Sequence, residues 1–216
     1  MFNINTFYKK SNNSDSINNQ NNSNNNNNNN DNSIRIIGID PGSIYTGWGI
    51  LDSSQFGRKI KLVSIGLIDA KKYHYPHNLG LIFNELKDVI EEYSPSIMVI
   101  ESVFSGLNPS SLIKLSQARG AICLLSSLFS INLKEYAPRY IKKNVAGYGG
   151  ADKEAVRRMV YNFIKELKDI NFNDNDGISD NNTGIEKGRK ILILNNNISD
   201  ALSAAICCAT DMSNYI

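Results

Sequence analysis

The sequence predicts an α/β domain in which helices flank a mixed five-stranded sheet. Three segments with strand patterns come first, and helical and strand patterns then alternate along the chain, an order typical of α/β layers. The five strands are expected at 34–39, 47–53, 59–70, 97–100 and 133–137. Apolar side chains recur every three or four residues in the expected helices at 79–93, 110–129, 152–167 and 198–209.

The first 33 residues form an Asn-rich tail that we expect to be disordered. Residues 11–33 contain Ile17 as their one apolar side chain, so burial cannot offset the entropy of ordering them. The folded domain should therefore span residues 34–216, with a polar inserted loop at 168–190. The first ten residues lack the apolar core of a secretory signal. No apolar run has the length needed to span a bilayer, so we expect no membrane association.

The cysteines and histidines do not indicate a disulfide framework or a zinc site. Cys123, Cys207 and Cys208 lie in apolar segments without a C-x-x-C pair, which predicts buried free thiols and a reducing, cytoplasmic compartment. His74 and His77 have no nearby thiol or third histidine, which favours a solvated loop. The formal net charge of +2 is too small to identify a binding partner.

Carboxylates follow two of the expected strands. Asp40 comes directly after the first strand, and Glu101 comes directly after the strand at 97–100. Ligands of open α/β sheets bind beyond the carboxyl ends of the strands, so the two acids would converge if these strands are parallel neighbours. Asp200 lies in the first turn of the last helix. Such a cluster repels itself unless a cation lies within it, and oxygen ligands suit Mg²⁺ or Mn²⁺.

The residues alone also allow a simpler interpretation. Asp40 precedes Pro41 and Gly42 and could merely close a turn. Asp200 could merely favour the N-terminus of a helix that Asn197 caps. The spacing of the acids does not decide between these two interpretations.

Four blocks of sequence resemble the RuvC family of Holliday-junction resolvases, in the family's order: GIDPGSIYTGWGI, IESVFSGLNPSSLIKLSQARGA, YAPRYIKKNVAGYGGADKEAVRRMV and ISDALSAAICC. The resemblance covers nearly all of 34–216 apart from the insertion. It implies an RNase H-like fold, a homodimer, and Mg²⁺-dependent symmetric nicking of four-way DNA junctions in recombination and repair. A branch-migration helicase complex is a further candidate partner. Actin-like phosphotransferases share a loop like IGIDPGS, but they need a second similar domain.

The resemblance implies roles for individual residues. Asp40, Glu101 and Asp200 match the family's catalytic acids, while Asn197 stands where the family has a fourth acid or a histidine. An amide oxygen can bind Mg²⁺ but brings no charge and cannot act as a base. A junction-binding protein with impaired catalysis is therefore the alternative. The acids of the insertion that could compensate are Asp174, Asp176 and Asp180.

Cations near the acids are expected to contact DNA phosphates. The candidates are Arg139, Lys142, Lys143 and Lys153. By resemblance, Lys142 and Lys153 match lysines associated with junction binding and catalysis, although any one cation in such a run could simply be solvated. Phe104 lies in a loop of Ser, Gly and Asn residues and matches a position that stacks on an unpaired base. A place in the core is its alternative.

Overall fold

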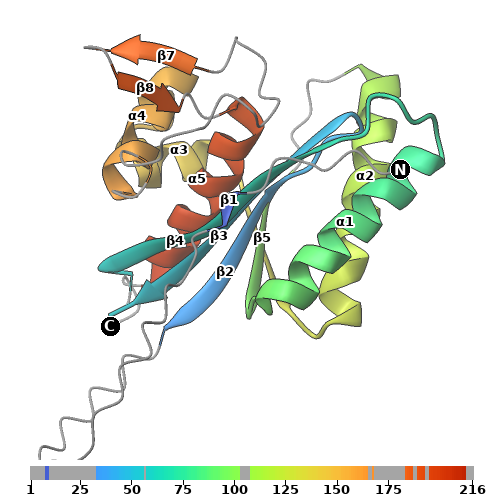
Figure 1. Ribbon diagram of the computed structural model, residues 1–216, viewed down its shortest axis with the longest axis horizontal. Helices are drawn as coiled ribbons and strands as arrows, with labels where there is room; N and C mark the ends of the chain where they lie inside the picture. Colours follow the sequence, from blue (N-terminus) through green and yellow to red (C-terminus); the bar gives the residue numbers. More distant parts are fainter. Residues whose placement is uncertain are drawn as a thin grey trace, which may run out of the picture.

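The computed structural model describes residues 8–9, 33–55, 57–102, 108–164, 167, 183–186, 189–192 and 195–212. A six-stranded sheet with the order β1-β4-β3-β2-β5-β6 forms its centre (Figure 1). The strands are β1 (Tyr8–Lys9), β2 (Ile34–Asp40), β3 (Tyr45–Ser54), β4 (Lys59–Asp69), β5 (Ile97–Glu101) and β6 (Asn132–Tyr136). The helices are α1 (His77–Tyr93), α2 (Pro109–Leu128), α3 (Pro138–Ala146), α4 (Lys153–Phe163) and α5 (Asn196–Asp211).

The predicted five-stranded mixed sheet is confirmed. Strands β4, β3 and β2 pair antiparallel, and β2, β5 and β6 pair parallel. The two-residue β1 adds a sixth strand on β4 and belongs to the tail for which disorder is predicted. The rest of that tail, 1–7 and 10–32, lies outside the described residues. In the part of the chain that the structure describes, no helix has the length and apolar character needed to cross a membrane.

Two features differ from the expected elements. The nine-residue α3 lies between β6 and α4, and its helical period is short because only Ile141 and Val145 are buried on it. A separate hairpin, β7 (Thr183–Glu186) with β8 (Arg189–Leu192), occupies the end of the segment expected to be a polar loop. The remainder of that loop, 168–182 and 187–188, lies outside the described residues.

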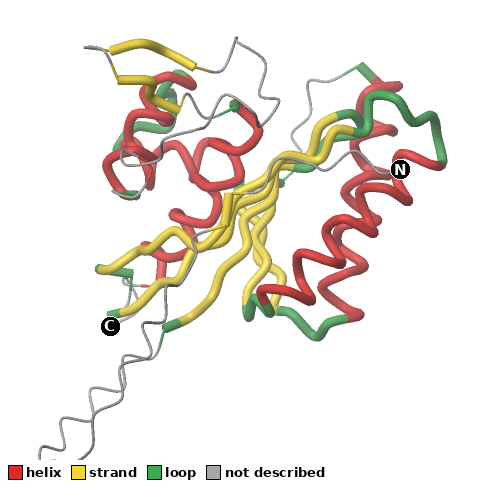
Figure 2. The backbone as a smooth tube through the Cα atoms, in the orientation of Figure 1, coloured by secondary structure: helices red, strands yellow, loops and turns green. Residues whose placement is uncertain are grey.

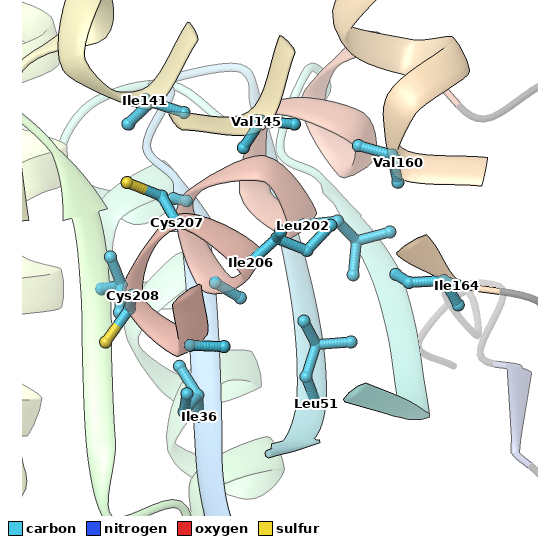
Figure 3. Close-up of a cluster of buried hydrophobic side chains, with 14 of the residues drawn as sticks. Ile36, Leu51, Ile141, Val145, Val160, Ile164, Leu202, Ile206, Cys207 and Cys208 are labelled. Atoms are coloured by element: carbon cyan, nitrogen blue, oxygen red, sulfur yellow. The ribbon is translucent and has the colours of Figure 1, made fainter. Parts of the chain in front are cut away.

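Helices cover both faces of the sheet, as Figure 2 shows: α1 and α2 pack on one face, and α3, α4 and α5 on the other. Side chains alternate between the faces because successive strand residues point in opposite directions. Ile36 and Leu51 point toward α5, whereas Ile37 and Ile50 point toward α1 and α2. Figure 3 shows the core cluster on the α5 face, where α3, α4 and α5 contribute side chains to one apolar layer.

The core accounts for two of the cysteines. Cys207 and Cys208 on α5 are fully buried free thiols, and burial raises the pKa of Cys207 to about 12. Cys123 is also free but only partly buried. The expectation of buried thiols is therefore confirmed for the pair on α5 and only in part for the cysteine on α2.

Two glycines, Gly38 on β2 and Gly47 on β3, let α5 lie directly against the sheet. A Cβ atom added to Gly38 would lie 2.0 Å from the carbonyl oxygen of Ala201. At Gly47 it would lie 2.2 Å from the carbonyl oxygen of Asn197. Any larger side chain at these positions would push α5 away from the strands. This glycine pair therefore sets the distance between the first turns of α5 and the sheet.

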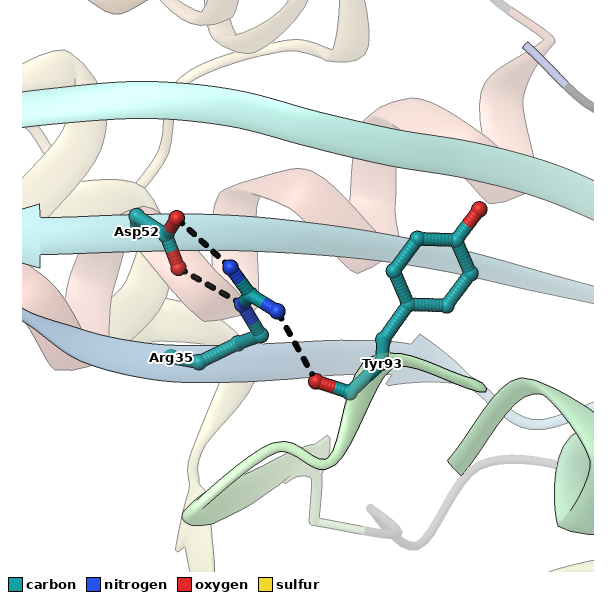
Figure 4. A network of polar contacts seen from close by, with 3 residues as sticks. All are labelled: Arg35, Asp52 and Tyr93. Atoms are coloured by element: carbon teal, nitrogen blue, oxygen red, sulfur yellow. Dashed lines mark hydrogen bonds and ion pairs between the residues drawn. The ribbon is translucent and has the colours of Figure 1, made fainter. Parts of the chain in front are cut away.

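A partly buried ion pair fastens the opposite end of the sheet to α1 (Figure 4). The guanidinium of Arg35 donates hydrogen bonds of 2.7 and 2.9 Å to the carboxylate of Asp52, its cross-strand partner. It also donates one of 3.0 Å to the carbonyl oxygen of Tyr93. The hydrogen bond with Asp52 raises the pKa of Arg35. Bidentate charge-assisted contacts of this kind fix geometry as well as adding energy.

Candidate active site

The strand pairing brings Asp40 and Glu101 to the same edge of the sheet. Strands β2 and β5 are parallel neighbours in which Ile39 is the partner of Ile100. Asp40 and Glu101, the next residues, therefore lie side by side in the following row of the sheet. Because side chains alternate, both acids point toward the face that α5 covers. The condition that the sequence left open, parallel neighbouring strands, is met.

The first turns of α5 lie over this pair. Asn197 places its carbonyl oxygen above Gly47, the cross-strand partner of Asp40, and Asp200 follows three residues later on the same side of the helix. The N-cap of α5 is Asn195, whose side chain accepts a 2.9 Å hydrogen bond from the backbone N–H of Asn197. The simpler interpretation in which Asn197 is the helix cap is therefore wrong.

The three carboxylates share one electrostatic field, and we call them the acid centre: Asp40, Glu101 and Asp200. Burial, together with the charges of Asp200 and Glu101, raises the pKa of Asp40 from 3.8 to about 7. Burial and then the charge of Asp200 raise the pKa of Glu101. Burial also raises the pKa of Asp200, although nearby lysines oppose it. Several acids in one place whose pKa values are raised by burial and by neighbouring charge mark a candidate functional site.

Two lysines from α3 and α4 oppose this negative charge. The ammonium of Lys153 lies 3.6 Å from a carboxylate oxygen of Asp200, and Lys142 lowers the pKa of both Glu101 and Asp200. Lys153 is the first residue of α4, whose N-cap Asp152 accepts a hydrogen bond from the third residue of the helix. Helix α3, which the sequence did not reveal, thus carries one of the two cations that reach the acid centre.

The other predicted residues lie farther from the acids or outside the described residues. Arg139 and Lys143 are exposed on α3, and neither forms an ion pair with the acid centre. Phe104 falls in 103–107, which the structure does not describe. The candidate acids of the insertion fall in 168–182, also outside the described residues.

The donor set of the acid centre fits a hard divalent cation, since it supplies carboxylate oxygens from three elements and mutual repulsion that a cation would relieve. Among the described residues, however, no three histidine, cysteine or acidic side chains are grouped closely enough to hold a metal ion by themselves. Mg²⁺ is commonly held by one or two carboxylates together with substrate phosphates and water. The acid centre is therefore an open site that needs further ligands from a substrate or solvent.

One residue of the site, Arg119, went unnoticed in the sequence. Its guanidinium donates a 2.5 Å hydrogen bond to the carbonyl oxygen of Glu101 and forms a 2.8 Å ion pair with Glu135 on β6. Its side chain is only 12% exposed. Arg119 thus fastens the end of β5 to α2 and β6. The available signal was one arginine within the small and apolar residues QARGAI of a predicted helix.

Comparison with known proteins agrees with this geometry. The family model described as crossover junction endodeoxyribonuclease RuvC matches residues 36–180. The RuvC of Hydrogenovibrio crunogenus is 44% identical over 131 residues, 61% of this chain and 75% of that protein. The RuvC of a Wolbachia from Brugia malayi is 40% identical over 134 residues, 62% of this chain and 82% of that protein.

Solved structures show the same fold. The Thermus thermophilus RuvC in complex with a Holliday junction substrate superposes with a TM-score of 0.66 at 20% identity, covering 84% of this chain and 96% of that one. The yeast mitochondrial Holliday junction resolvase superposes with a TM-score of 0.55 at 12% identity, covering 84% and 81%. At these identities the likeness establishes the fold alone.

The mixed sheet and the helices on both faces define an RNase H-like fold. Within that class, the chain belongs to the RuvC family of crossover junction endodeoxyribonucleases. The matched range includes Asp40, Glu101 and both lysines of the site but ends before α5. The place of Asp200 in the acid centre therefore rests on the packing of α5 against the glycine pair.

Proposed function

We propose that this protein is a Mg²⁺-dependent nuclease that resolves four-way DNA junctions by symmetric phosphodiester hydrolysis. The observation that carries the proposal is the acid centre, in which burial raises the pKa of Asp40, Glu101 and Asp200 and the charge of Asp200 adds to the shift at the other two, beside Lys142 and Lys153. Family membership supplies the reaction class, and the junction as substrate follows the name of the Thermus relative.

The acid centre, together with the amide oxygen of Asn197, would hold Mg²⁺, for which Mn²⁺ can substitute. When bound, the cation would polarise the scissile phosphate and lower the pKa of the attacking water. The three carboxylates would hold that cation at the sheet edge. Lys153 and Lys142 stand where they can hold the phosphate backbone and offset the negative charge that develops during hydrolysis.

More distant DNA contacts follow from the helices around the site. Arg139 and Lys143 are exposed on α3, the helix that carries Lys142, and would contact phosphates beyond the reacting one. Phe104 would stack on an unpaired base at the junction centre. A branch-migration helicase complex and a cytoplasmic location complete the proposal.

A homodimer would place two acid centres on one junction, as paired nicks require. Support comes from α2, where Ile113, Leu124 and Leu128 are exposed apolar residues spaced along one side of the helix. Gly120 lies on the same side, and a Cβ added there would meet no atom within 4 Å. No described residue of the protomer approaches that position closely enough to require a glycine, and a glycine there would let a second helix pack close to α2.

The test is cleavage of an end-labelled four-way junction with Mg²⁺. Paired nicks at symmetric positions, with a linear duplex of the same sequence left intact, are the expected result. Asp40→Asn should keep junction binding and abolish nicking, because it removes a charged ligand without changing side-chain size. No nicking with either Mg²⁺ or Mn²⁺ would refute the nuclease, and cleavage by the variant would refute the metal assignment.

A second candidate function is junction binding with impaired catalysis. Asn197 favours it, because this residue lies beside the acid centre without contributing a charge. In that case the protein would shift a junction on a native gel without cleaving it, and Asn197→Asp would restore nicking. If the unsubstituted protein already nicks junctions, the amide is sufficient and this alternative fails.

A further inference from the structure

The connection between β4 and α1 carries basic and aromatic side chains that the acid centre does not use. Residues 71–77, KKYHYPH, are all exposed. Among them Tyr75 is 65% exposed, and Tyr73 is 43% exposed. These are uncommon places for large aromatic side chains, which bury 150–250 Å² when they are covered. The sequence predicted a solvated loop here, and the exposure of these residues agrees with that prediction. Solvation alone does not explain why the loop carries lysines and tyrosines.

This connection lies beside the loop that follows Asp40. The backbone N–H of Ala70 donates a 2.8 Å hydrogen bond to the carbonyl of Ile44. The side chain of Asn78, at the start of α1, donates one of 3.0 Å to the carbonyl of Ser43. These hydrogen bonds join the loop between β2 and β3 to the connection between β4 and α1, at the same edge of the sheet.

The position relative to the acids follows from the strand register. Tyr45 pairs with Asp69 on β4, two residues beyond the Gly47 that pairs with Asp40. At about 3.4 Å per residue, this row lies about 7 Å beyond that of Asp40. Ile44 and Tyr45 are themselves exposed, so apolar surface continues from this row into the connection.

The backbone of the connection is held in place. The N–H of Lys71 donates a 2.9 Å hydrogen bond to the side chain of Asp69, and the N–H of Tyr73 donates one of 2.9 Å to the carbonyl of Ala70. The N–H of Asn78 donates to the carbonyl of His74. Side chains presented from a fixed backbone lose less entropy on binding a ligand.

The β4–α1 connection and the two lysines beside the acid centre, Lys142 and Lys153, lie on opposite sides of the sheet. In Figure 1 it runs on the α1 side, whereas α3 and α4 lie on the other side. Lys71 and Lys72 are exposed and outnumber the one acid beside them, Asp69. Phosphates recur about every 3.4 Å along one strand of duplex DNA. A DNA strand that has one phosphate at the acid centre therefore has further phosphates on both sides of that centre.

We propose that residues 71–75, together with Ile44 and Tyr45, form a second DNA-contacting surface, the β4–α1 surface. Lys71 and Lys72 bind phosphates of a DNA arm that leaves the acid centre on the α1 side, and Tyr73 and Tyr75 contact sugars or unstacked bases near the branch point. Lysines interleaved with exposed tyrosines suit a polyanion with aromatic bases. The proposal rests on the proposed function, because it takes the four-way junction as the ligand.

The test compares variants by fluorescence anisotropy on a labelled four-way junction, with Ca²⁺ in place of Mg²⁺ and over a range of salt concentrations. Lys71→Gln with Lys72→Gln removes the two charges. Lys59→Gln with Lys61→Gln is the matched control, since these exposed lysines lie on β4, the strand that leads into the connection, about 30 Å from its end at Asp69. Tyr73→Ser with Tyr75→Ser removes the two rings and leaves the charges.

We expect the Lys71/Lys72 variant to raise the Kd about tenfold near 0.1 M salt and to reduce the slope of log Kd against log salt by about 1 to 2. The Tyr73/Tyr75 variant should raise the Kd about fivefold with the slope unchanged, and the control should stay within twofold. If the loop variants bind like the control while the unsubstituted protein binds and cleaves junctions, the β4–α1 surface is refuted alone. If the unsubstituted protein does not bind junctions, the proposed function has failed first.

Discussion

At the scale of single residues, Asp40 bears a marked electrostatic cost in the metal-free protein. Its pKa is raised from 3.8 to about 7, first by burial and then by Asp200 and Glu101. The folded protein therefore keeps a proton on Asp40 at pH values where the unfolded chain has lost it. The sign follows: this group destabilises the fold progressively as pH rises from about 4 to about 7, by about 4 kcal/mol in all.

Asp40→Asn should therefore be more stable than the unsubstituted protein in EDTA at pH 8, because the amide is never ionised. At pH 5, where Asp40 is largely protonated, the difference should shrink. Thermal unfolding of both proteins at the two pH values measures this, and the comparison cancels the groups they share. Added Mg²⁺ at pH 8 should stabilise the unsubstituted protein more than the variant. Equal differences at both pH values would contradict the assignment.

Arg119 acts on the site through Glu101 and is a positioning residue. Its loss leaves the carbonyl of Glu101 and the carboxylate of Glu135 without their guanidinium. Arg119→Ala should lower the single-turnover nicking rate about 10- to 100-fold, since small displacements of reacting groups are costly, while the Kd for the junction changes little. Arg119→Lys should recover part of the rate.

The matched control for Arg119 is Glu135→Gln. It weakens the ion pair to β6 but leaves the hydrogen bond to the carbonyl of Glu101, so its nicking rate should stay close to that of the unsubstituted protein. Equal losses for Glu135→Gln and Arg119→Ala would show that Arg119 serves the general stability of the sheet and not the acid centre.

At the scale of elements, α5 assembles the site because the glycine pair lets it approach the strands. Gly47→Ala places a methyl group against the backbone of Asn197, and such overpacking costs about 1–3 kcal/mol. We expect a lower free energy of unfolding in urea together with slower nicking, because the turn that carries Asp200 is displaced. Gly80→Ala on α1 is the control: its added Cβ meets nothing within 4 Å, and the change should be neutral or slightly stabilising.

The elements also show what the sequence could and could not predict. Apolar runs followed by acids were sufficient to place Asp40 and Glu101 at strand ends, and their parallel pairing bore this out. The approach of α5 depends on glycines that meet a backbone distant in sequence, which no periodicity reveals. Arg119 escaped notice for the same reason, since its partner is a carbonyl group. Asn195, Asn196 and Asn197 are three identical candidates for the N-cap of α5, and only the structure shows that Asn195 is the N-cap.

At the scale of the whole molecule, the proposed dimer depends on the exposed side of α2. Leu124→Glu with Leu128→Glu places two charges where we expect a second protomer, so sedimentation velocity should show a monomer in place of a dimer. Nicks on the two strands of a junction should then become uncoupled. Asn84→Glu, at an exposed position of α1, should leave the dimer intact. A monomeric unsubstituted protein would contradict the proposal.

The placement of Asp200 on α5 has a consequence for the synthesis of this nuclease. α5 is the last helix of the described chain, and it contributes both an acid of the site and the central helix of one core layer. A nascent chain that stops before α5 lacks the third carboxylate and leaves the glycine pair uncovered. Because the proposed mechanism needs Asp200, we expect polypeptides whose synthesis stops before α5 to lack nicking activity, which would arise only after this helix has docked on the sheet.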